Sequence, residues 1–443
     1  MGGQERVGKG RQDEADTLLA TLTSAEAITD PYPLYARLRA LAPAHRAPSG
    51  AVFVTRYEDC AAVTRDPAFR SQSPGWRDRV MPGWRDRPAR VATSQAMEFR
   101  DPPDHTRLRR LVSASFTPRQ VSNMREDVER LTGRVLNLIA DGGSAGSAVN
   151  LREVLASSLP VSVIGTLVGV PPADWIPLQE SMSALLEVSE LSAGPAELAA
   201  ADRAAADLRE YFADLVADRR RAPRDDLATA LLAARKGNAD AADAVSPAGP
   251  VRPAGPASLT GAGSNGHPGL TEDELLQTLV FVFMAGGDTM INLLTNGTAA
   301  LLAHPEQANA LRDDPRLQSG AVDEVLRYDA PVQFVGRVAN ADTTIGGVPV
   351  PRDGLIIAML GAANRDPARF PSADSFDISR TDTTVLSFGG GIHYCLGALL
   401  ARLEAGTFFP ALLERFPTLR LAGLPRRRGL VHRGFSHLPV AAR

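Results

Sequence analysis

Apolar residues recur every three or four positions through most of this 443-residue chain, and proline or glycine interrupts the pattern at intervals. This spacing is typical of amphipathic helices that bury one face. Long helices are predicted over residues 104–115, 121–140, 151–169, 200–220, 271–303, 316–328 and 396–415, with a shorter one over 57–65. Strand-like runs occur at 51–55, 348–350 and 355–358. The predicted fold class is mainly α with a minor β region.

The predicted helix 271–303 is polar only where it begins. Thr271 and Glu274 have the spacing of a capping box, and the run LVFVFMAGGDTMINLL is apolar on every face, as in a helix that crosses the interior. Two glycines, each weakening a helix by about 1 kcal/mol, and a buried carboxylate that needs partners are unusual there. They belong to the run Ala285-Gly286-Gly287-Asp288-Thr289. On its own, this run fits either a kink with a back-bonded threonine or a local opening that carries a functional acid and hydroxyl.

Three segments differ from the rest in composition. Residues 1–29 are interpreted as a polar N-terminal extension, and residues 30–443 as a single domain. Residues 236–269 contain no aromatic side chain and are dominated by Ala, Gly, Pro and Ser, which predicts a flexible insertion or, alternatively, a partner-binding segment. The sequence PGWRDR occurs at 74–79 and again at 82–87, a local duplication that either decorates the surface or contacts a substrate or partner.

Composition narrows the class of protein. Hydrophobic residues make up 44% of the chain, and 48 basic residues face 51 acidic ones, a balance that does not favour a nucleic-acid binder. The two cysteines, Cys60 and Cys395, cannot form a disulfide framework. The chain starts with a polar, charged run, and no later segment is continuously apolar over the length that a membrane helix needs. A cytoplasmic protein without a membrane anchor is expected.

The strongest chemical signal is a glycine-rich run, Phe388-Gly389-Gly390-Gly391-Ile392-His393-Tyr394-Cys395-Leu396-Gly397. A thiolate that binds a metal has to stay deprotonated, although a free thiol titrates at about pH 8.5. Backbone N–H groups and a helix N-terminus favour the anion, and glycines let the backbone curl around the sulfur. The residues after Cys395 predict a helix, so the cysteine should lie where that helix begins. A zinc site would require further ligands nearby, whereas a cysteine nucleophile with His393 stays conceivable from these residues alone.

This run resembles the haem-binding loop of the cytochrome P450 family in its soluble bacterial form. The resemblance extends from about Asp30 to the C-terminus and is interrupted by residues 236–269. It implies one large cytochrome P450 fold, a haem b cofactor and Cys395 as the ligand of the haem iron, with Phe388 shielding the sulfur. It also implies that Ala285 and Gly286 border a groove for O₂.

The same resemblance assigns further roles. Asp288 would relay protons and Thr289 would hydrogen-bond the dioxygen; the position after Thr289, often a second threonine in relatives, is Met290. Glu324 and Arg327, three residues apart on a predicted helix, would join Arg380 in a structural cluster. The residues expected to hold the haem propionates are His105, Arg109, Arg337 and His393.

The resulting hypothesis is a monooxygenase that uses O₂, two electrons and two protons to oxidise a hydrophobic small molecule, with hydroxylation as the first outcome and epoxidation as the second. The substrate is expected to be a secondary metabolite such as a polyketide or peptide. The residues after Cys395 are too few for a fused reductase, so a separate ferredoxin or flavodoxin with an NAD(P)H reductase should supply electrons to a monomeric enzyme, docking near Arg107, Arg110 and Arg402. Substrate contacts are expected from 70–100, 175–195, 283–287, 332–336 and 435–437. A peroxide-driven peroxygenase and a non-catalytic haem-binding protein are the alternatives.

Overall fold

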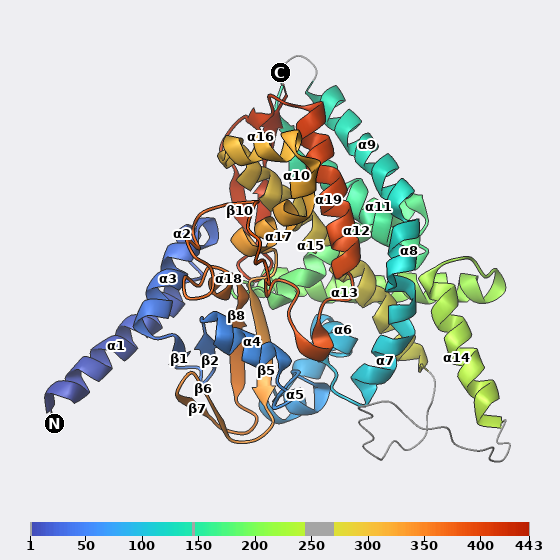
Figure 1. Ribbon diagram of the computed structural model, residues 1–443. Helices are drawn as coiled ribbons and strands as arrows, with labels where there is room; N and C mark the ends of the chain where they lie inside the picture. Colours follow the sequence, from blue (N-terminus) through green and yellow to red (C-terminus); the bar gives the residue numbers. More distant parts are fainter. Residues whose placement is uncertain (1, 144–146, 244–269, 443) are drawn as a thin grey trace, which may run out of the picture.

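The computed structural model describes residues 2–143, 147–243 and 270–442. Helices gather in the upper part of Figure 1, and the principal sheet lies below them. The helices are α1 (Gly2–Thr21), α2 (Ala25–Thr29), α3 (Tyr32–Leu41), α4 (Tyr57–Arg65), α5 (Pro74–Val80), α6 (Pro88–Ser94), α7 (Asp104–Ser113), α8 (Pro118–Asn123), α9 (Arg125–Gly142), α10 (Leu151–Ala156), α11 (Leu159–Val168), α12 (Trp175–Leu186), α13 (Pro195–Arg221), α14 (Leu227–Asp243), α15 (Glu272–Ala303), α16 (Pro305–Asp313), α17 (Gln318–Tyr328), α18 (Leu360–Ala363) and α19 (Ala398–Arg415). The predicted fold class, mainly α with a minor β region, is confirmed.

The principal sheet has the strand order β1-β2-β8-β5-β3, with β2 parallel to β8 and the other neighbours antiparallel. The strands are β1 (Ala44–Arg46), β2 (Val52–Val54), β3 (Phe69–Arg70), β4 (Val149–Asn150), β5 (Phe334–Ala339), β6 (Thr343–Ile345), β7 (Val348–Val350), β8 (Leu355–Met359), β9 (Arg420–Leu421), β10 (Arg426–Arg428), β11 (Gly434–His437) and β12 (Pro439–Ala441). Successive side chains of a strand alternate between its faces. Val335 and Arg337, two residues apart on β5, therefore share one face.

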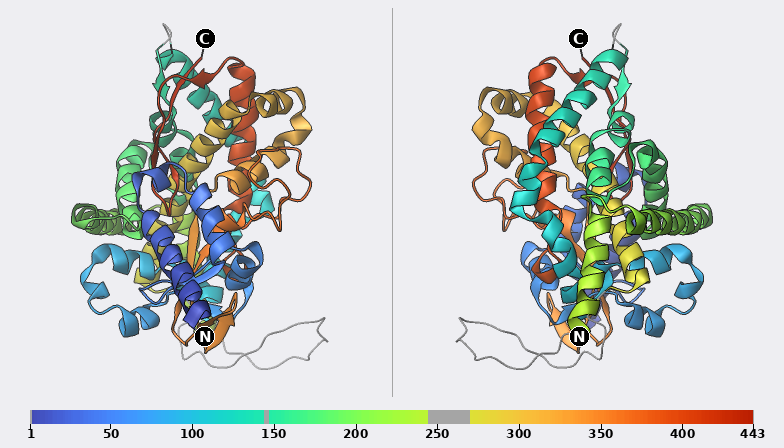
Figure 2. Two further views of the ribbon diagram at one scale, coloured as in Figure 1. Left: turned by 90° about the vertical axis from the view of Figure 1, so that its left-hand side faces the viewer. Right: turned by 90° about the vertical axis from the view of Figure 1, so that its right-hand side faces the viewer.

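Helix α15 crosses the helical part, and most of its residues are buried. It packs against α10, α11, α12, α13, α17 and α19, and its remaining face borders the cavity described below. Thr271 and Glu274 form the predicted capping box, each side chain accepting the other residue's backbone N–H. By length and hydropathy alone, α15 and the stretch Leu151–Val168 could each cross a membrane, but both lie mostly inside the protein, as core helices do. Helices α9 and α19 lie side by side in both Figures 1 and 2.

The acid–base cluster predicted at Glu324 is confirmed. Arg327 Nε lies 2.7 Å from a Glu324 carboxylate oxygen, and both side chains are fully buried. Arg380 Nε lies 3.3 Å from the other oxygen. Arg327 also donates hydrogen bonds to the carbonyl oxygens of Asn364 and Ala373. Buried ions are tolerated only when they are paired and hydrogen-bonded in this way.

Several predicted helices have different boundaries. The predicted helix 151–169 is broken into α10 and α11, because Pro160 lies in the first turn of α11, where its missing N–H is harmless, and could not continue α10. The predicted helix 121–140 is likewise divided, since α8 ends at Asn123 and α9 begins at Arg125. The predicted helix 104–115 ends as α7 at Ser113 and continues as a 3₁₀ turn.

Two segments that sequence analysis set apart are helical where the structure describes them. In the N-terminal extension, α1 buries Ala15 and Leu18 against Tyr35, so this part of the chain contributes apolar side chains to the protein body. Helix α14 continues to Asp243, and therefore a helix covers the beginning of the predicted flexible insertion. Residues 244–269 lie outside the described part of the chain.

The two PGWRDR copies are packing elements. Trp76, in α5, is buried and donates its indole N–H to the carbonyl oxygen of Asp353 at 2.9 Å. Trp84 is buried as well and donates to the Asp78 carboxylate, which belongs to the first copy. The tryptophans are therefore not surface decoration, and neither lines the cavity described below.

Candidate active site

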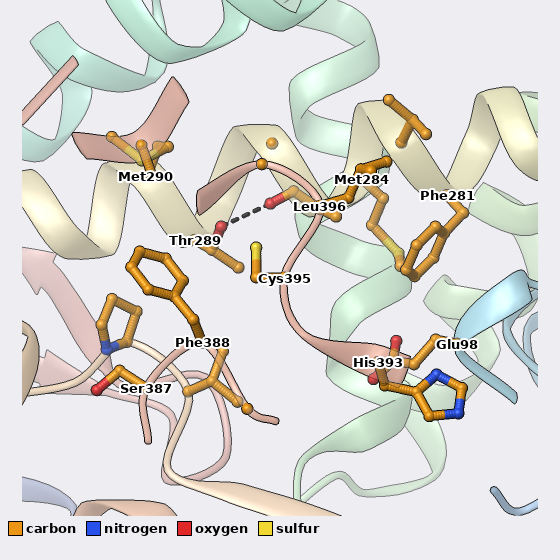
Figure 3. A pocket seen from close by; sticks show the side chains of 18 of the residues that line it. Glu98, Phe281, Met284, Thr289, Met290, Ser387, Phe388, His393, Cys395 and Leu396 are labelled. Atoms are coloured by element: carbon orange, nitrogen blue, oxygen red, sulfur yellow. Dashed lines mark hydrogen bonds between the residues drawn. The ribbon is translucent and has the colours of Figure 1, made fainter. Parts of the chain in front are cut away.

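A cavity lies between α15, strand β5 and the loop that carries Cys395 (Figure 3). Segments far apart in the sequence meet there, since α7, α15, β5 and the cysteine loop all contribute to its wall. The predicted site residues that line the cavity are His105, Arg109, Ala285, Gly286, Thr289, Arg337, Phe388, His393 and Cys395. Asp288 does not line it. Figure 3 shows the Cys395 sulfur pointing toward α15.

The cysteine loop is held by backbone geometry that requires glycine. Gly389 and Gly391 have φ angles of 68° and 61°, in the left-handed region that other residues rarely adopt. A Cβ atom on Gly391 would also lie 2.8 Å from the carbonyl oxygen of Thr64, so the loop sits directly on α4. The Cys395 N–H donates to the Phe388 carbonyl oxygen at 2.9 Å, which closes the loop. Helix α19 begins three residues later, at Ala398, rather than at the cysteine itself.

The surroundings of the sulfur act on its proton affinity in opposite directions. Burial raises the pKa of the Cys395 thiol, while the Gly397 N–H and the positive charge of Arg109 act to lower it. The Phe388 ring lies beside the sulfur in Figure 3, and the Arg402 guanidinium lies 4.7 Å from the centre of that ring. A metal cation on the sulfur would favour the thiolate further.

Basic side chains converge at another part of the cavity wall. The centres of the His105 and His393 rings are 4.3 Å apart, and the charges of Arg109 and Arg337 lower the pKa of both. Burial, followed by Arg109 and Arg337, lowers the pKa of His105 to about 4; burial and then Arg337 lower that of His393 to about 3. Neither ring nitrogen of His105, both of which are buried, has a hydrogen-bond partner within the described residues. Clustered cations and orphaned donors of this kind indicate a site for anionic groups.

These features match the requirements of a haem. A haem needs a metal-binding side chain near its centre and cations or hydrogen-bond donors for its two carboxylates at one edge. Cys395 offers the first, and the cluster of Arg109, Arg337, His105 and His393 offers the second. The unpartnered nitrogens of His105 are accounted for if a carboxylate lies next to them. The residues present therefore fit the group that the sequence resemblance implies.

On α15, Thr289 faces the cavity and donates its hydroxyl to the Ala285 carbonyl oxygen at 2.6 Å (Figure 3, dashed line). The helix is continuous through this region, so the expected local opening is absent from the structure. The back-bonded threonine that sequence analysis considered as the structural alternative is present. The hydroxyl can still reach the cavity by rotation about χ1, because its backbone position borders that cavity.

The glycines of α15 have a packing role. A Cβ atom on Gly286 would lie 2.7 Å from the Ile164 side chain of α11. On Gly287 it would lie 2.5 Å from the Gln179 amide oxygen of α12. Two neighbouring helices thus approach α15 too closely for any larger residue. This close approach explains why glycine occurs at both positions despite its low helix propensity.

Asp288 is fully buried on the side of α15 that faces away from the cavity. Its carboxylate lies 2.8 Å from Arg152 and accepts the Ser183 hydroxyl at 3.0 Å, while Arg428 lies 3.8 Å away. Burial alone would raise the pKa of Asp288, but Arg428, Arg152 and Ser183 outweigh it and hold this pKa below its usual range. Asp288 is therefore an ionised, paired carboxylate one residue from Thr289.

Three ionisable residues of the cavity wall were not predicted: Glu98, Glu404 and His432. Burial raises the pKa of Glu404 well above its usual value, and one of its oxygens has no partner among the described residues. Glu98 lies inside the predicted contact region 70–100 without having been singled out, and charge in an otherwise apolar wall was the signal available. His432 gives no such signal, because its place depends on a β-bridge to Val332.

Four of the five predicted substrate-contact regions contribute to the cavity wall. They do so through Met97, Leu186, Met284 and Val335, among others. The fifth region, 435–437, does not. The Phe435 ring is buried, and the Arg427 guanidinium lies over it, 3.8 Å from the centre of the ring. The turn that precedes it reaches the cavity instead, through His432.

Comparison with known proteins agrees with this site. The family model for cytochrome P450 matches residues 52–422. Cytochrome P450 BJ-3 of Bradyrhizobium diazoefficiens is 34% identical over 95% of both chains, and the monooxygenase PikC of Streptomyces venezuelae is 37% identical over 88% of this chain and 85% of its own. The crystal structure of P450BioI with an acyl-carrier-protein ligand superposes with a TM-score of 0.81 at 32% identity, covering 95% of this chain and 100% of that one.

The chain belongs to the cytochrome P450 family and has the cytochrome P450 fold. Its relatives include proteins named as a monooxygenase, a hydroxylase and a polyketide biosynthesis cytochrome P450, and this protein is a cytochrome P450 monooxygenase. Membership of this family implies a haem-iron cofactor.

Proposed function

We propose that the protein uses haem b and O₂ to insert one oxygen atom into a hydrophobic small molecule. The observation that carries this proposal is a single cavity that joins the Cys395 thiol, a cationic edge and the Thr289 hydroxyl. In the balanced reaction, a substrate C–H bond, O₂, two electrons and two protons give an alcohol and water. Epoxidation of an alkene is the second outcome.

The site residues would have two roles, binding the haem and supplying protons. Bound haem would supply electron transfer and the activation of dioxygen. Cys395 would hold its iron, and Arg109 and Arg337 with the two histidines would hold its carboxylates. Thr289 would turn its hydroxyl from the Ala285 carbonyl into the cavity and donate a proton there. Asp288 would pass protons to it, which requires its side chain to leave Arg152.

The substrate class follows from the cavity wall and from relatives. Away from the cationic cluster, the wall is mostly apolar, with Ile164, Leu186, Val282 and Val332 among its residues, which suits a hydrophobic ligand. One relative, PksS of Bacillus subtilis, is named for polyketide biosynthesis, and another is the 6-deoxyerythronolide B hydroxylase of Saccharopolyspora erythraea. We therefore assign a secondary metabolite such as a polyketide or peptide as substrate.

Electrons would come from a separate ferredoxin or flavodoxin with its NAD(P)H reductase, delivered to a monomeric, cytoplasmic enzyme. The proposed docking face surrounds the cysteine loop. Arg110 is exposed there, whereas Arg107 is paired with Glu274 and Arg402 with Asp323. Of the basic residues in the predicted docking face, Arg110 is thus the most accessible to an acidic partner.

The haem-thiolate assignment is tested by the spectrum of the reduced protein under carbon monoxide. The purified protein should show the absorbance band typical of thiolate-ligated haem, and Cys395→Ser should lose it. Cys60→Ser is the matched control, because Cys60 is buried, hydrogen-bonded to the Val54 carbonyl and outside the cavity. Correctly folded protein that takes up no haem, or a band that survives in Cys395→Ser, would refute the proposal.

Thr289→Ala tests the reaction itself. We expect NAD(P)H consumption to continue while product falls and peroxide is released. Thr298→Ala is the control, since Thr298 makes the same backbone hydrogen bond on the same helix, to Leu294, but lies away from the cavity. Full turnover with H₂O₂ alone, and none with O₂ and ferredoxin, would identify a peroxygenase; haem binding without any turnover would identify a non-catalytic protein.

A further inference from the structure

One carboxylate in the cavity wall has no role in the mechanism above. Glu98 belongs to a 3₁₀ turn, Met97–Phe99, and its side chain is exposed although protein surrounds it, because the surface that it exposes is that of the cavity. Within the described residues, its carboxylate has neither a hydrogen bond nor an ion pair. Figure 3 shows it beside His393 at the edge of the cavity.

The charges that act on Glu98 come from both ends of the cavity. Burial raises its pKa, and Arg337, His432 and Arg77 act in the opposite direction. Arg337 belongs to the cationic cluster on β5, whereas His432 lies beside Val332, where the wall is apolar. Glu98 therefore lies between the cationic edge and the apolar part of the cavity.

A charge balance shows what Glu98 is free to bind. The two haem carboxylates would be matched by the two arginines of the edge, Arg109 and Arg337, with hydrogen bonds from His105 and His393. These cations would then be engaged. Glu98 would keep only the longer-range influence of Arg77 and His432, neither of which forms an ion pair with it among the described residues, and Arg77 Nε donates to the Gln72 carbonyl instead. A buried carboxylate is costly unless a cation reaches it. A cationic group on the ligand would stabilise the carboxylate there.

We propose that Glu98 binds a cationic nitrogen, a protonated amine or a quaternary ammonium, of an otherwise apolar substrate. This inference deepens the proposed function and rests on it, since it takes the cavity to hold both haem and substrate. The apolar residues Met97, Ile164, Leu186 and Val332 would contact the hydrocarbon part. The substrate is thereby defined as an amphiphile with one basic group rather than a neutral or acidic lipid.

The test compares three ligands with the same chain length: dodecyltrimethylammonium and dodecanoate below their micelle concentrations, and dodecanol below its solubility limit. A quaternary ammonium cannot ligate iron, so its affinity reports the cavity alone. Affinities for the haem-loaded protein are measured by calorimetry and by the shift of the Soret band. The ammonium should bind about tenfold more tightly than the alcohol, the effect expected of one desolvated ionic contact.

The variants locate this preference at residue 98. Glu98→Gln should abolish the tenfold difference and change the affinity for dodecanol less than twofold, whereas Glu98→Asp should keep most of the difference. Glu98→Lys should shift the preference to dodecanoate. Asp104→Asn is the matched control, because this carboxylate is half-exposed at the start of α7 and lies outside the cavity.

Each result supports or overturns the inference. A wild-type protein without preference for the ammonium, or a preference that persists in Glu98→Gln, would overturn it. So would a Glu98→Gln variant that changes haem content or reduction potential but not ligand preference, because Glu98 would then serve the haem edge. The carbon monoxide spectrum is recorded for every variant. If the band of thiolate-ligated haem is missing from the wild type, the proposed function is wrong. If the band is normal and the wild type shows no ammonium preference, only the role of Glu98 is wrong.

Discussion

Replacing Glu190 by glutamine should destabilise the turn that brings His432 to the cavity. Glu190 follows α12 by four residues in the sequence. Its carboxylate accepts hydrogen bonds from the backbone N–H groups of Leu430, Val431 and His432 at 2.7–3.0 Å. Three charge-assisted hydrogen bonds from a single side chain hold this turn in place. A glutamine has nearly the same shape but lacks the charge, so it isolates the electrostatic contribution.

The magnitude follows from the proton affinity of this group. Although burial would raise it, the pKa of Glu190 is lowered from 4.5 to about 2 by His432 and the backbone N–H groups. At about 1.4 kcal/mol for each tenfold change in an equilibrium constant, this difference corresponds to roughly 3 kcal/mol. The His432 side chain lies 3.6 Å away, which is long for a hydrogen bond, so the backbone groups carry the effect and about 2 kcal/mol is the better expectation.

The pH dependence gives the prediction its sign. The folded-state pKa is below the unfolded one, so the stabilisation is complete above about pH 5 and is lost as the pH falls through 4.5 toward 2. The free energy of unfolding of Glu190→Gln should therefore be lower than that of the wild type at pH 7, with a smaller gap at pH 3.5. Hydrogen exchange should also speed up at residues 430–432. Equal stabilities at pH 7, or a gap that does not narrow in acid, would refute this account.

Three further predictions concern packing and docking. Arg327→Met should lower the free energy of unfolding by about 3–5 kcal/mol, because it removes the arginine that contacts both oxygens of a fully buried glutamate and leaves only Arg380 beside it. Arg316→Met at an exposed pair should change it by less than about 0.5 kcal/mol; similar effects in a urea titration would contradict the cluster's role. Gly286→Ala should cost about 1–3 kcal/mol by displacing α11, and Ile164→Val should relieve part of this in the double variant; additive effects would exclude the contact. Arg110→Glu should slow ferredoxin-driven turnover without changing the carbon monoxide spectrum, and an unchanged rate would move the docking face elsewhere.

The sequence was most informative where local chemistry determines structure. The capping box at Thr271, the apolar run after it and the glycine loop at Cys395 predicted α15 and the site loop, because caps, periodicity and positive φ angles are local properties. The acid–base cluster at Glu324 and the cationic edge came from the family resemblance, and composition would have placed both on the surface. The structure shows that both are buried or half-buried.

The rest depended on contacts between segments distant in the sequence. The glycines of α15 were interpreted as an opening in the helix, but α11 and α12 press against them, which only the assembled fold reveals. Asp288 was placed correctly in the helix, yet its orientation toward Arg152 follows from the position of α10. Glu98 and His432 entered the cavity wall through a short turn and a single β-bridge, neither of which has a sequence pattern.

The distribution of tryptophan gives the protein a built-in optical probe. Its three indoles are Trp76, Trp84 and Trp175, and the segments that carry them, α5 with its duplicate and α12, are chain neighbours of the turn with Glu98 and of Leu186 in the cavity wall. The cysteine loop and α19 contain no indole. Intrinsic emission should therefore follow movements on the ligand side while staying silent about events at the docking face, so that one fluorescence trace separates substrate arrival from electron delivery.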